Sequence, residues 1–242
     1  VSIEPRDSLL KRTDALGRRA QFIAANLTQI VVVCAAQPPL REGLIDRYLI
    51  AARLEGLKAT ILFNKTDLLN SEDLQTYQQR LSCYAKVGHP VYFGNCTTPD
   101  GLGMLHEALD NEVSILVGHS GVGKTSIINQ LLPDYDGRTN VLSSASNKGQ
   151  HTTTSSLLHR LPTGGELIDT PGIRSFGLYG VTRQSLADHF PDFDIVEDEC
   201  RFNNCTHQHE PKCAVIDYVQ ADKIGTHRYE AYLKLLESTE TQ

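Results

Sequence analysis

The sequence predicts an α/β fold followed by a small helical region, and three observations support this prediction. Continuous apolar runs at 28–34, 58–63 and 113–117 are typical of buried parallel strands, and segments suited to helices follow them. The glycine-rich stretch Gly118–Thr125 joins the third run to an apolar helix, which gives the order strand, loop, helix. After residue 181 the pattern changes to helices and polar loops that include a cluster of Cys and His.

Length and composition bound the class of protein. A chain of 242 residues, 40% of them hydrophobic, is long enough for one medium-sized domain with a smaller one attached. The formal net charge of −6 argues against a protein wrapped in nucleic acid, although a net value can hide a local basic patch. No apolar run approaches the length of a membrane span and no signal peptide is visible. We therefore expect a cytoplasmic protein, monomeric and without a membrane partner.

The start of the chain is basic and leads into the first buried strand. Residues 1–20 contain five arginines and lysines among few apolar side chains. Their composition favours a solvated lead-in, and an RNA-phosphate contact is the alternative. In the apolar run at 28–34, Cys34 is expected to be a small core residue. Apolar side chains at helical spacing then predict a helix at 44–54 that ends near Gly56.

The glycine-rich loop has the composition of a phosphate-binding site. Its glycines let the backbone approach an anion closely, so that successive N–H groups and the helix N-terminus face the phosphates. Lys124 can reach the β- and γ-phosphates, and the Thr125 hydroxyl can ligate Mg²⁺. A chance glycine-rich turn is the alternative, but the spacing, the Lys-Thr pair and the flanking elements all favour a phosphate loop. The residues expected at the phosphates are Gly118, Ser120, Gly121, Val122, Gly123, Lys124, Thr125 and Ser126.

The second apolar run leads into Asn64-Lys-Thr-Asp67, which has the pattern of a guanine site. The Asp67 carboxylate can accept two hydrogen bonds from guanine, and adenine lacks this pair of donors. The Asn64 amide can bond the far side of the base, and the stem of Lys65 can lie over its face. The alternative is a helix cap, because Asp67 or Ser71 could cap a helix at 71–86. The phosphate loop in the same chain favours the guanine site.

A third loop is expected to complete the base site. It follows a strand at 89–93 and precedes a helix at 102–110. In this loop the backbone N–H groups of Asn95 and Cys96 are candidates for the guanine carbonyl.

The segment after the phosphate-loop helix has the composition of a mobile switch. Residues 132–150 are rich in Asn, Ser, Asp and Gly and end in His151-Thr-Thr-Thr154. A nucleotide enzyme needs a hydroxyl that closes onto Mg²⁺ when the γ-phosphate is present. We assign this role to Thr153, with the neighbouring threonines as alternatives. The alternative is a strand entry, because Thr favours strands, and both can hold.

Two strands follow the threonines, at 155–161 and 166–168, around a Pro-Thr-Gly-Gly turn. The second strand ends in Asp169-Thr-Pro-Gly172. An aspartate at this position can hold Mg²⁺ directly or through water, and the Gly172 N–H can meet the γ-phosphate. Alone this motif is only a turn signature, and its place after the phosphate loop gives it weight.

The C-terminal region contains the ligand set of a structural zinc site. The candidate ligands are Cys200, Cys205, His207 and Cys213. Three thiolates and one imidazole form the closed set of four that structural zinc requires. Unrelated thiols are one alternative, and His209 in place of His207 is another. Helices are expected at 182–190, with Thr182 as its cap, and at 229–236.

The order of these motifs resembles that of one known family. The guanine motif precedes the phosphate loop, whereas Ras-like GTPases have the reverse order, and a Cys-x4-Cys-x-His-x5-Cys segment follows. The chain is similar, over nearly its whole length, to the circularly permuted GTPase family of ribosome small-subunit-dependent GTPase A (RsgA/YjeQ). The resemblance implies an α/β fold, a circularly permuted Ras-like P-loop GTPase domain, followed by a small helical zinc-binding domain. We expect a lead-in at 1–20, the GTPase domain at 21–180 and the zinc-binding domain at 181–242.

The resemblance also implies an activity and partners. The chain would bind GTP with Mg²⁺, hydrolyse it to GDP and phosphate, and carry one structural Zn²⁺. It would act in late assembly of the small ribosomal subunit, with the subunit and its rRNA as partners and the subunit as activator. A GTP-binding assembly module with negligible turnover is one alternative. An ATP-using enzyme is another, and Asn64 and Asp67 argue against it.

Two features depart from the family pattern. Family members begin with an OB-fold, of which only something like the last strand, at 1–10, is expected here. The loop after the third strand usually carries Ser-Ser or Ser-Ala, and Asn95-Cys96 stands in this chain. Contacts made by the backbone would survive that change.

The residue that orients the attacking water is not the usual one. Ras-like enzymes have a glutamine directly after Asp-x-x-Gly, where this chain has Ile173. We therefore expect slow turnover by the isolated chain, with Lys124, Thr125 and Mg²⁺ stabilising the transferring phosphoryl group. His151 is the candidate for guiding the water, since neutral imidazole can orient it through one nitrogen, and an exposed loop histidine is the alternative. No further nucleotide motif lies between 172 and 200, so we expect the nucleotide state to reach the zinc segment.

Overall fold

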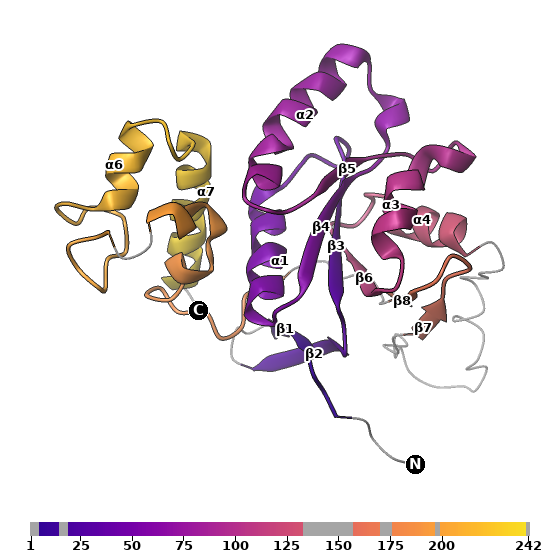
Figure 1. Cartoon of the computed structure of the whole chain (residues 1–242), viewed down its shortest axis with the longest axis horizontal. Coiled ribbons are helices and arrows are strands. Elements are labelled where there is room, and N and C mark those ends of the chain that lie inside the picture. Colours follow the sequence, from indigo (N-terminus) through magenta and orange to yellow (C-terminus); the bar gives the residue numbers. More distant parts are fainter. Residues whose placement is uncertain (1–4, 15–18, 133–156, 170–175, 197–198, 241–242) are drawn as a thin grey trace, which may run out of the picture.

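The centre of the computed structural model is a six-stranded β-sheet (Figure 1). The structure describes residues 5–14, 19–132, 157–169, 176–196 and 199–240. The strands are β1 (Leu9–Thr13), β2 (Ala20–Ala25), β3 (Gln29–Cys34), β4 (Lys58–Phe63), β5 (Val91–Phe93), β6 (Val113–Val117), β7 (Leu157–Arg160) and β8 (Glu166–Asp169). The order across the central sheet is β5-β4-β3-β6-β8-β7, and only the pair β7–β8 is antiparallel. The three apolar runs are thus confirmed as the adjacent parallel strands β4, β3 and β6.

Helices cover both faces of the central sheet. They are α1 (Glu42–Leu54), α2 (Ser71–Lys86), α3 (Gly103–Leu109) and α4 (Lys124–Leu131). Helices α1 and α2 lie on one face, and α3 and α4 lie on the other (Figure 1). The helix expected at 102–110 begins as a 3-10 turn, η2 (Pro99–Leu102). Helix α2 is capped by Asn70, whose side-chain oxygen accepts a hydrogen bond from the Asp73 N–H at 2.8 Å, so capping explains neither Asp67 nor Ser71.

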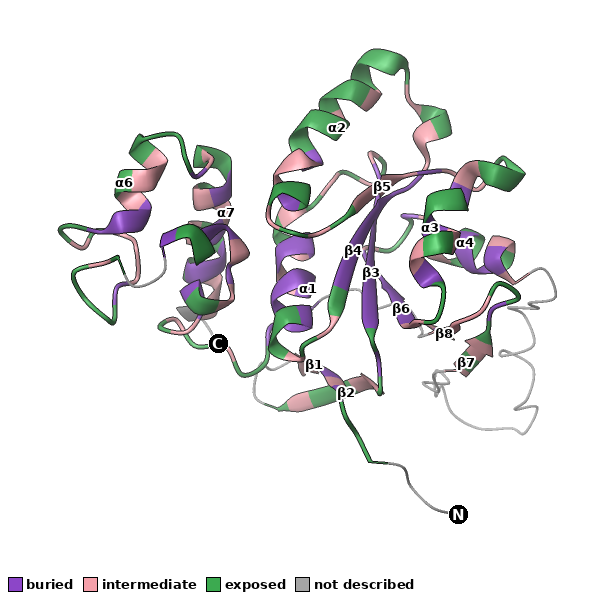
Figure 2. Ribbon diagram, in the orientation of Figure 1, coloured by how far each residue is buried: buried purple, intermediate pink, exposed green. Residues whose placement is uncertain are grey.

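The two faces of the sheet have separate hydrophobic cores, because successive side chains of a strand point to opposite faces. Along β3, Ile30 and Val32 belong to the core shared with α1 and α2, whereas Val31 and Val33 belong to the core shared with α3 and α4. All residues of β3 are buried, as a continuous apolar run predicts for a central parallel strand (Figure 2).

The start of the chain is structured, unlike the solvated lead-in that its composition favours. Strand β1 pairs antiparallel with β2 in a second, two-stranded sheet, and Leu10 is fully buried. The strand begins at Leu9, several residues later than the strand expected at 1–10. The Thr13 N–H donates to the Gly177 carbonyl at 3.0 Å, so this ribbon also holds the segment that follows β8. The burial of Leu10 in the core shows that the ribbon packs on the domain, which a count of charges does not reveal.

The C-terminal region is helical, but its first expected helix is wrong. Residues 182–190 form turns and the short 3-10 helix η3 (Ala187–His189). The Thr182 hydroxyl accepts a hydrogen bond from the Ser185 N–H at 3.2 Å, as a cap would, but Pro191 disfavours helical backbone before it and the helix does not develop. The remaining elements are η4 (Pro191–Val196), α6 (Ala214–Gln220) and α7 (Thr226–Glu240), the last of which contains the helix expected at 229–236. None of the helices in the described ranges is both long enough and apolar enough to cross a membrane.

Candidate nucleotide site and metal centre

The predicted nucleotide motifs meet at the carboxyl ends of the parallel strands. Asn64 follows β4, the loop Gly118–Thr125 follows β6, and Asp169 is the last residue of β8. In an open parallel sheet, ligands bind at this edge where neighbouring loops diverge. A cavity of about 380 Å³ lies here, lined by most of the phosphate loop together with Lys65 and Asp169. Val122 buries its side chain in the core, so only its backbone is left for the contact with the phosphates that the sequence predicts.

Three glycines shape the phosphate loop as the sequence predicts. Gly118, Gly121 and Gly123 have φ angles of 141°, 87° and 101°, which side-chain-bearing residues rarely adopt. A Cβ at Gly118 would lie 2.1 Å from the Val33 carbonyl oxygen, so the loop packs directly on the end of β3. This close approach explains how the loop stays pressed onto the sheet while its N–H groups remain at the cavity.

Lys124 lies where the loop folds over its own start. Its ammonium donates hydrogen bonds to the carbonyl oxygens of Gly118 at 2.7 Å and His119 at 3.0 Å. Partial burial lowers the pKa of Lys124. The ammonium is therefore held at the loop by neutral carbonyls, and no carboxylate among the contacts described for it competes with an incoming phosphate.

Asn64 connects the guanine motif to the phosphate loop. Its buried side chain donates from Nδ2 to the Val122 carbonyl at 2.9 Å, and its Oδ1 lies 3.8 Å from the Cys96 thiol. A Cβ at Gly123 would lie 2.4 Å from that Nδ2, so glycine is needed where the amide passes. One of the two N–H groups of this amide is thus used within the protein, because a buried amide needs partners of its own. The amide has a second N–H, so its contact with the base stays a prediction.

Lys65 makes a second connection between the same two loops. Its backbone is left-handed, with φ 65°, and its ammonium donates to the Gly121 carbonyl at 2.6 Å and the Gln37 carbonyl at 3.1 Å. The stem borders the cavity, which agrees with the expected position over a base. Asp67 lies exposed on the 3-10 turn η1 (Thr66–Leu68), which leaves its carboxylate accessible to a ligand.

The loop after β5 offers fewer free backbone N–H groups to the base site than the sequence suggested. The Asn95 N–H already donates to the Gly101 carbonyl at 3.0 Å, so it is not available for a guanine carbonyl. The Asn95 side-chain oxygen accepts hydrogen bonds from both N–H groups and both hydroxyls of Thr97 and Thr98. Asn95 thus shapes the loop, and Cys96 beside Asn64 is the residue that this loop brings to the motif.

The predicted magnesium ligands are only partly within the described residues. Thr125 and Asp169 both line the cavity, from the start of α4 and the end of β8. Hydroxyl and carboxylate oxygens suit Mg²⁺, so the two residues fit the expected ion. The switch residues His151, Thr153, Gly172 and Ile173 lie outside the described ranges.

The four predicted zinc ligands converge in the C-terminal region. One ligand atom from each of Cys200, Cys205, His207 and Cys213 lies within 4.8 Å of the others. The His207 Nδ1 is 3.6 Å from the Cys200 sulfur and 3.4 Å from the Cys213 sulfur. A tetrahedron with ordinary Zn–S and Zn–N bond lengths has S···N edges of roughly 3.6 Å. None of the six cysteines forms a disulfide, and exposed His209 is not part of the cluster, so the donor set fits zinc as predicted.

Residues that the sequence did not single out hold this cluster in shape. The Glu210 carboxylate accepts hydrogen bonds from the Thr206 N–H and hydroxyl at 2.8 and 2.6 Å, and from two further N–H groups of the loop. These donors lower the pKa of Glu210 to about 2, although burial acts in the opposite direction. The hydroxyls of Tyr229 and Tyr232 on α7 donate to the carbonyls of His207 and Thr206 at 2.6 and 2.9 Å. No local pattern signals the two tyrosine contacts, because they join distant parts of the chain.

Comparisons with known proteins agree with this geometry. The model of the family described as RsgA GTPase matches residues 3–179. The chain belongs to the RsgA GTPase family. A relative from Hahella chejuensis, named Small ribosomal subunit biogenesis GTPase RsgA, is 42% identical over 242 residues, which cover 100% of this chain and 69% of that protein.

Two solved structures resemble this RsgA-family chain throughout. YjeQ from Thermotoga maritima matches with a TM-score of 0.81 and 26% identity, over 100% of this chain and 78% of that one. YloQ, described as a circularly permuted GTPase, matches with a TM-score of 0.77 and 26% identity, over 99% and 74% of the two chains. The predicted family and fold class are thus confirmed.

Membership of the RsgA GTPase family confirms the expected enzyme class, a GTP hydrolase. It also explains the motif order. In the sheet, β4 and β6 flank β3 on either side, so the guanine motif and the phosphate loop face one another across the same edge. Changing their order along the chain leaves this arrangement intact, since a permutation alters connections and not strand neighbours.

Proposed function

We propose that this chain binds GTP with Mg²⁺, hydrolyses it to GDP and phosphate, and acts in late assembly of the small ribosomal subunit. One observation carries the nucleotide part: the hydrogen bonds of Asn64 to Val122 and of Lys65 to Gly121 join the base motif and the phosphate loop at one cavity. The ribosomal part rests on the names of the relatives. We propose the subunit and its rRNA as partners, with the protein acting as a monomer in the cytoplasm.

We assign the residue roles from chemistry and position. Asp67 recognises guanine, Lys65 covers the base, and Cys96 contributes its backbone. The phosphate loop, with Lys124, holds the phosphates. Thr125 and Asp169 would hold Mg²⁺, joined by Thr153 when the switch closes, and Gly172 would contact the γ-phosphate. The ion supplies charge neutralisation on the phosphates.

We also propose the division of the chain into domains. The GTPase domain would comprise residues 21–180 and the zinc-binding domain residues 181–242. The β1–β2 ribbon lies at the start and contacts the segment that joins the two. In relatives an OB-fold would precede this ribbon, as the resemblance implies.

The decisive experiment is GTP hydrolysis with and without purified small ribosomal subunits. We expect slow turnover by the protein alone and a large acceleration by the subunit. Negligible phosphate release in both conditions would favour the alternative, a GTP-binding assembly module. ATP that competes equally with GTP would contradict the guanine assignment.

One zinc ion per chain is expected in freshly purified, reduced protein. Because three thiolates and an imidazole bind the ion, its removal should unfold the segment around 200–213. Metal analysis and hydrogen exchange of this segment, before and after chelation, measure both effects. Cys213→Ser should lose the zinc, whereas Cys83→Ser on α2 should keep it, because Cys83 lies outside the cluster. A protein without zinc, or with a Cys200–Cys205 disulfide, contradicts the site.

Replacing Asn64 by Ala should weaken GTP binding about tenfold or more. The change leaves the buried Val122 carbonyl without its partner, at a cost of about 1–3 kcal/mol, and loosens the loop that holds the phosphates. Asn70→Ala is the matched control: it removes the cap of α2, so it should lower thermal stability and leave GTP affinity unchanged. Titration calorimetry measures the GTP affinity of both variants and of the unmodified protein. An Asn64→Ala affinity equal to that of the unmodified protein would remove Asn64 from the site.

A further inference from the structure

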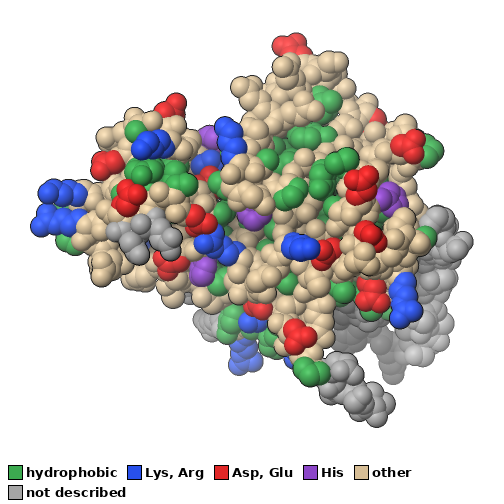
Figure 3. All heavy atoms as spheres, in the orientation of Figure 1, with side chains coloured by type: hydrophobic (Ala, Val, Ile, Leu, Met, Phe, Trp, Pro, Cys, Tyr) green, Lys and Arg blue, Asp and Glu red, His purple; other side chains and the backbone are tan. Residues whose placement is uncertain are grey.

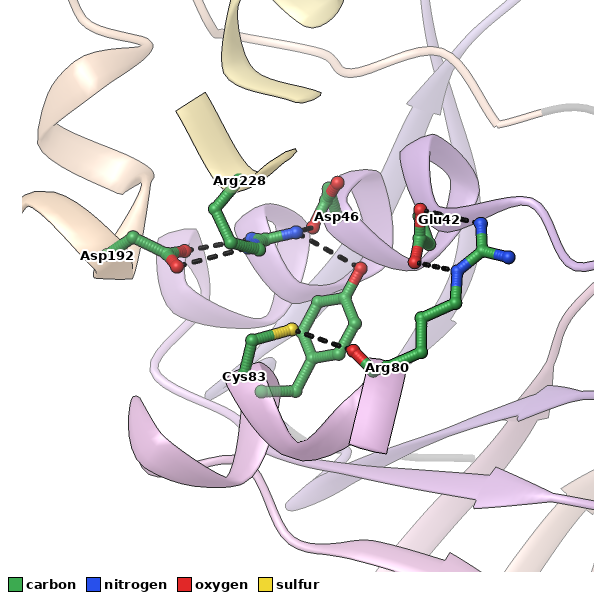
Figure 4. Close-up of polar contacts among 7 residues, drawn as sticks. Glu42, Asp46, Arg80, Cys83, Asp192 and Arg228 are labelled. Atoms are coloured by element: carbon green, nitrogen blue, oxygen red, sulfur yellow. Dashed lines mark hydrogen bonds and ion pairs between the residues drawn. The ribbon is translucent and has the colours of Figure 1, made fainter. Parts of the chain in front are cut away.

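A buried arginine joins the zinc region to the GTPase core. Arg228, on α7, is 3% exposed and makes a two-pronged contact with Asp192 of η4, at 3.0 and 2.8 Å. The same guanidinium donates to Asp46 of α1 at 2.7 Å and to the Tyr84 hydroxyl of α2 at 3.1 Å. Figure 4 shows Arg228 reaching from α7 between Asp192 and Asp46. One side chain thus connects both regions of the protein.

The surroundings make this contact rigid. The Arg228 guanidinium lies 4.5 Å from the ring centre of Tyr84 and 4.8 Å from that of Phe190. One arginine faces two buried carboxylates, and burial raises the pKa of Asp46 to about 6 although Arg228 acts in the opposite direction. Rigid forks of this kind hold geometry better than flexible surface pairs do. The cluster therefore fixes the angle at which α7 meets α1.

Helix α1 also touches the nucleotide site through its next buried residue. Tyr48 is fully buried, and its hydroxyl has no hydrogen-bond partner among the described residues. That hydroxyl lies near the backbone amide of Gly118, which opens the phosphate loop, without reaching hydrogen-bond geometry. The Tyr48 ring packs on Phe176, with centroids 4.5 Å apart. Phe176 comes a few residues after Gly172, the expected γ-phosphate contact.

The contacts of α1 with Phe176 and with the zinc region lie in one hydrophobic core. The residues of α1, Phe176, and Phe190 of the zinc region belong to the same cluster of buried side chains. A displacement of Phe176 would therefore meet Tyr48 first and, two residues away on the same helix, Asp46. Packed elements pass on such movements because close-packed interiors deform little.

We propose that helix α1 transmits the state of the nucleotide to the zinc region, with Arg228 as the positioning residue at the junction. This inference rests on the proposed function, since it assigns the path by which a bound nucleotide reaches the metal-binding part. The zinc region would change its orientation when GTP replaces GDP, and the Arg228 cluster would convert the movement of α1 into that change.

The test is hydrogen exchange of residues 199–213, with saturating GDP or a non-hydrolysable GTP analogue and no ribosomal subunit. The unmodified protein should show a nucleotide-dependent difference in exchange rate. Arg228→Gln should reduce that difference at least about fivefold, while zinc content stays at one ion per chain. Arg53→Ala is the matched control, because it removes the exposed Arg53–Asp194 pair at the same interface and should keep the difference.

A second variant keeps the test valid if Arg228→Gln fails to fold. Asp46→Leu leaves the Arg228–Asp192 pair balanced in charge and removes only the contact of Arg228 with α1, so it should also lose the difference. The inference is overturned if the unmodified protein shows no difference, or if both Arg228→Gln and Asp46→Leu keep it. Hydrolysis assays of the unmodified protein test the proposed function separately, because the exchange experiment involves neither turnover nor the subunit.

Discussion

Asp67→Asn should move the base preference of this GTPase from guanine to xanthine. The Asp67 carboxylate is exposed on η1, two residues after Lys65, which lines the nucleotide cavity. Guanine offers its ring N–H and exocyclic amine as donors. A site built to bond a substrate N–H rejects an analogue that lacks it by roughly 10⁴-fold. An asparagine amide can instead donate to the second carbonyl of xanthine. Competition binding of GTP, XTP and ATP to both proteins measures the shift.

The control for this prediction is another exposed carboxylate in a neighbouring loop. Asp100 lies on η2, which follows the loop of Asn95 and Cys96. Asp100→Asn removes the same charge without touching the base motif, so it should leave GTP preferred. An unchanged preference for GTP in Asp67→Asn would show that another residue selects the base.

His151→Ala should remove most of the hydrolysis that the small ribosomal subunit stimulates. A positioned group that orients or deprotonates the attacking water contributes about 10²-fold or more, and Ile173 at the usual glutamine position has no polar atom to do so. The phosphate loop and Lys124 do not depend on His151. GTP affinity should therefore stay nearly unchanged while the stimulated rate falls at least about 10²-fold. Single-turnover hydrolysis with saturating subunits separates the chemical step from binding.

His106 on α3 provides the control for the loss of an imidazole. His106→Ala removes a half-buried histidine on the helix that follows the base loop, so its stimulated rate should match that of the unmodified protein. Full stimulated turnover by His151→Ala would exclude this histidine from the mechanism. Equal rates with and without subunits, in the unmodified protein, would exclude activation by the subunit.

Local chemistry was enough to predict the backbone of the phosphate loop and the cluster of zinc ligands. The phosphate loop requires glycines at positions with left-handed backbone, and Gly118, Gly121 and Gly123 have that backbone. The zinc cluster follows from ligand type and spacing, because three thiolates and one imidazole form the closed set of four ligands that structural zinc requires. The uninterrupted apolar run of β3 likewise predicts a strand covered on both faces.

The contacts of individual amides were not predictable in the same way. The sequence did not show that the Asn64 nitrogen, expected at the base, also holds the Val122 carbonyl; the Asn95 N–H was expected at the base, yet it closes a turn with Gly101. Both outcomes follow from the same rule, that a buried donor must find a partner. The partner depends on which loops the sheet brings together, and the sequence does not show how close those loops lie.

Residue type and local spacing were enough to predict the fold class, the family and the four clustered zinc ligands. The connection between the sites depends instead on how distant elements pack. Nothing near Arg228 in the chain indicates that it would meet Asp46, 182 residues away, or that Tyr48 would lie between Gly118 and Phe176. A buried charge can be identified as part of an ion pair only once its partner is known. The partners here come together only when α1, α2 and α7 pack in one core.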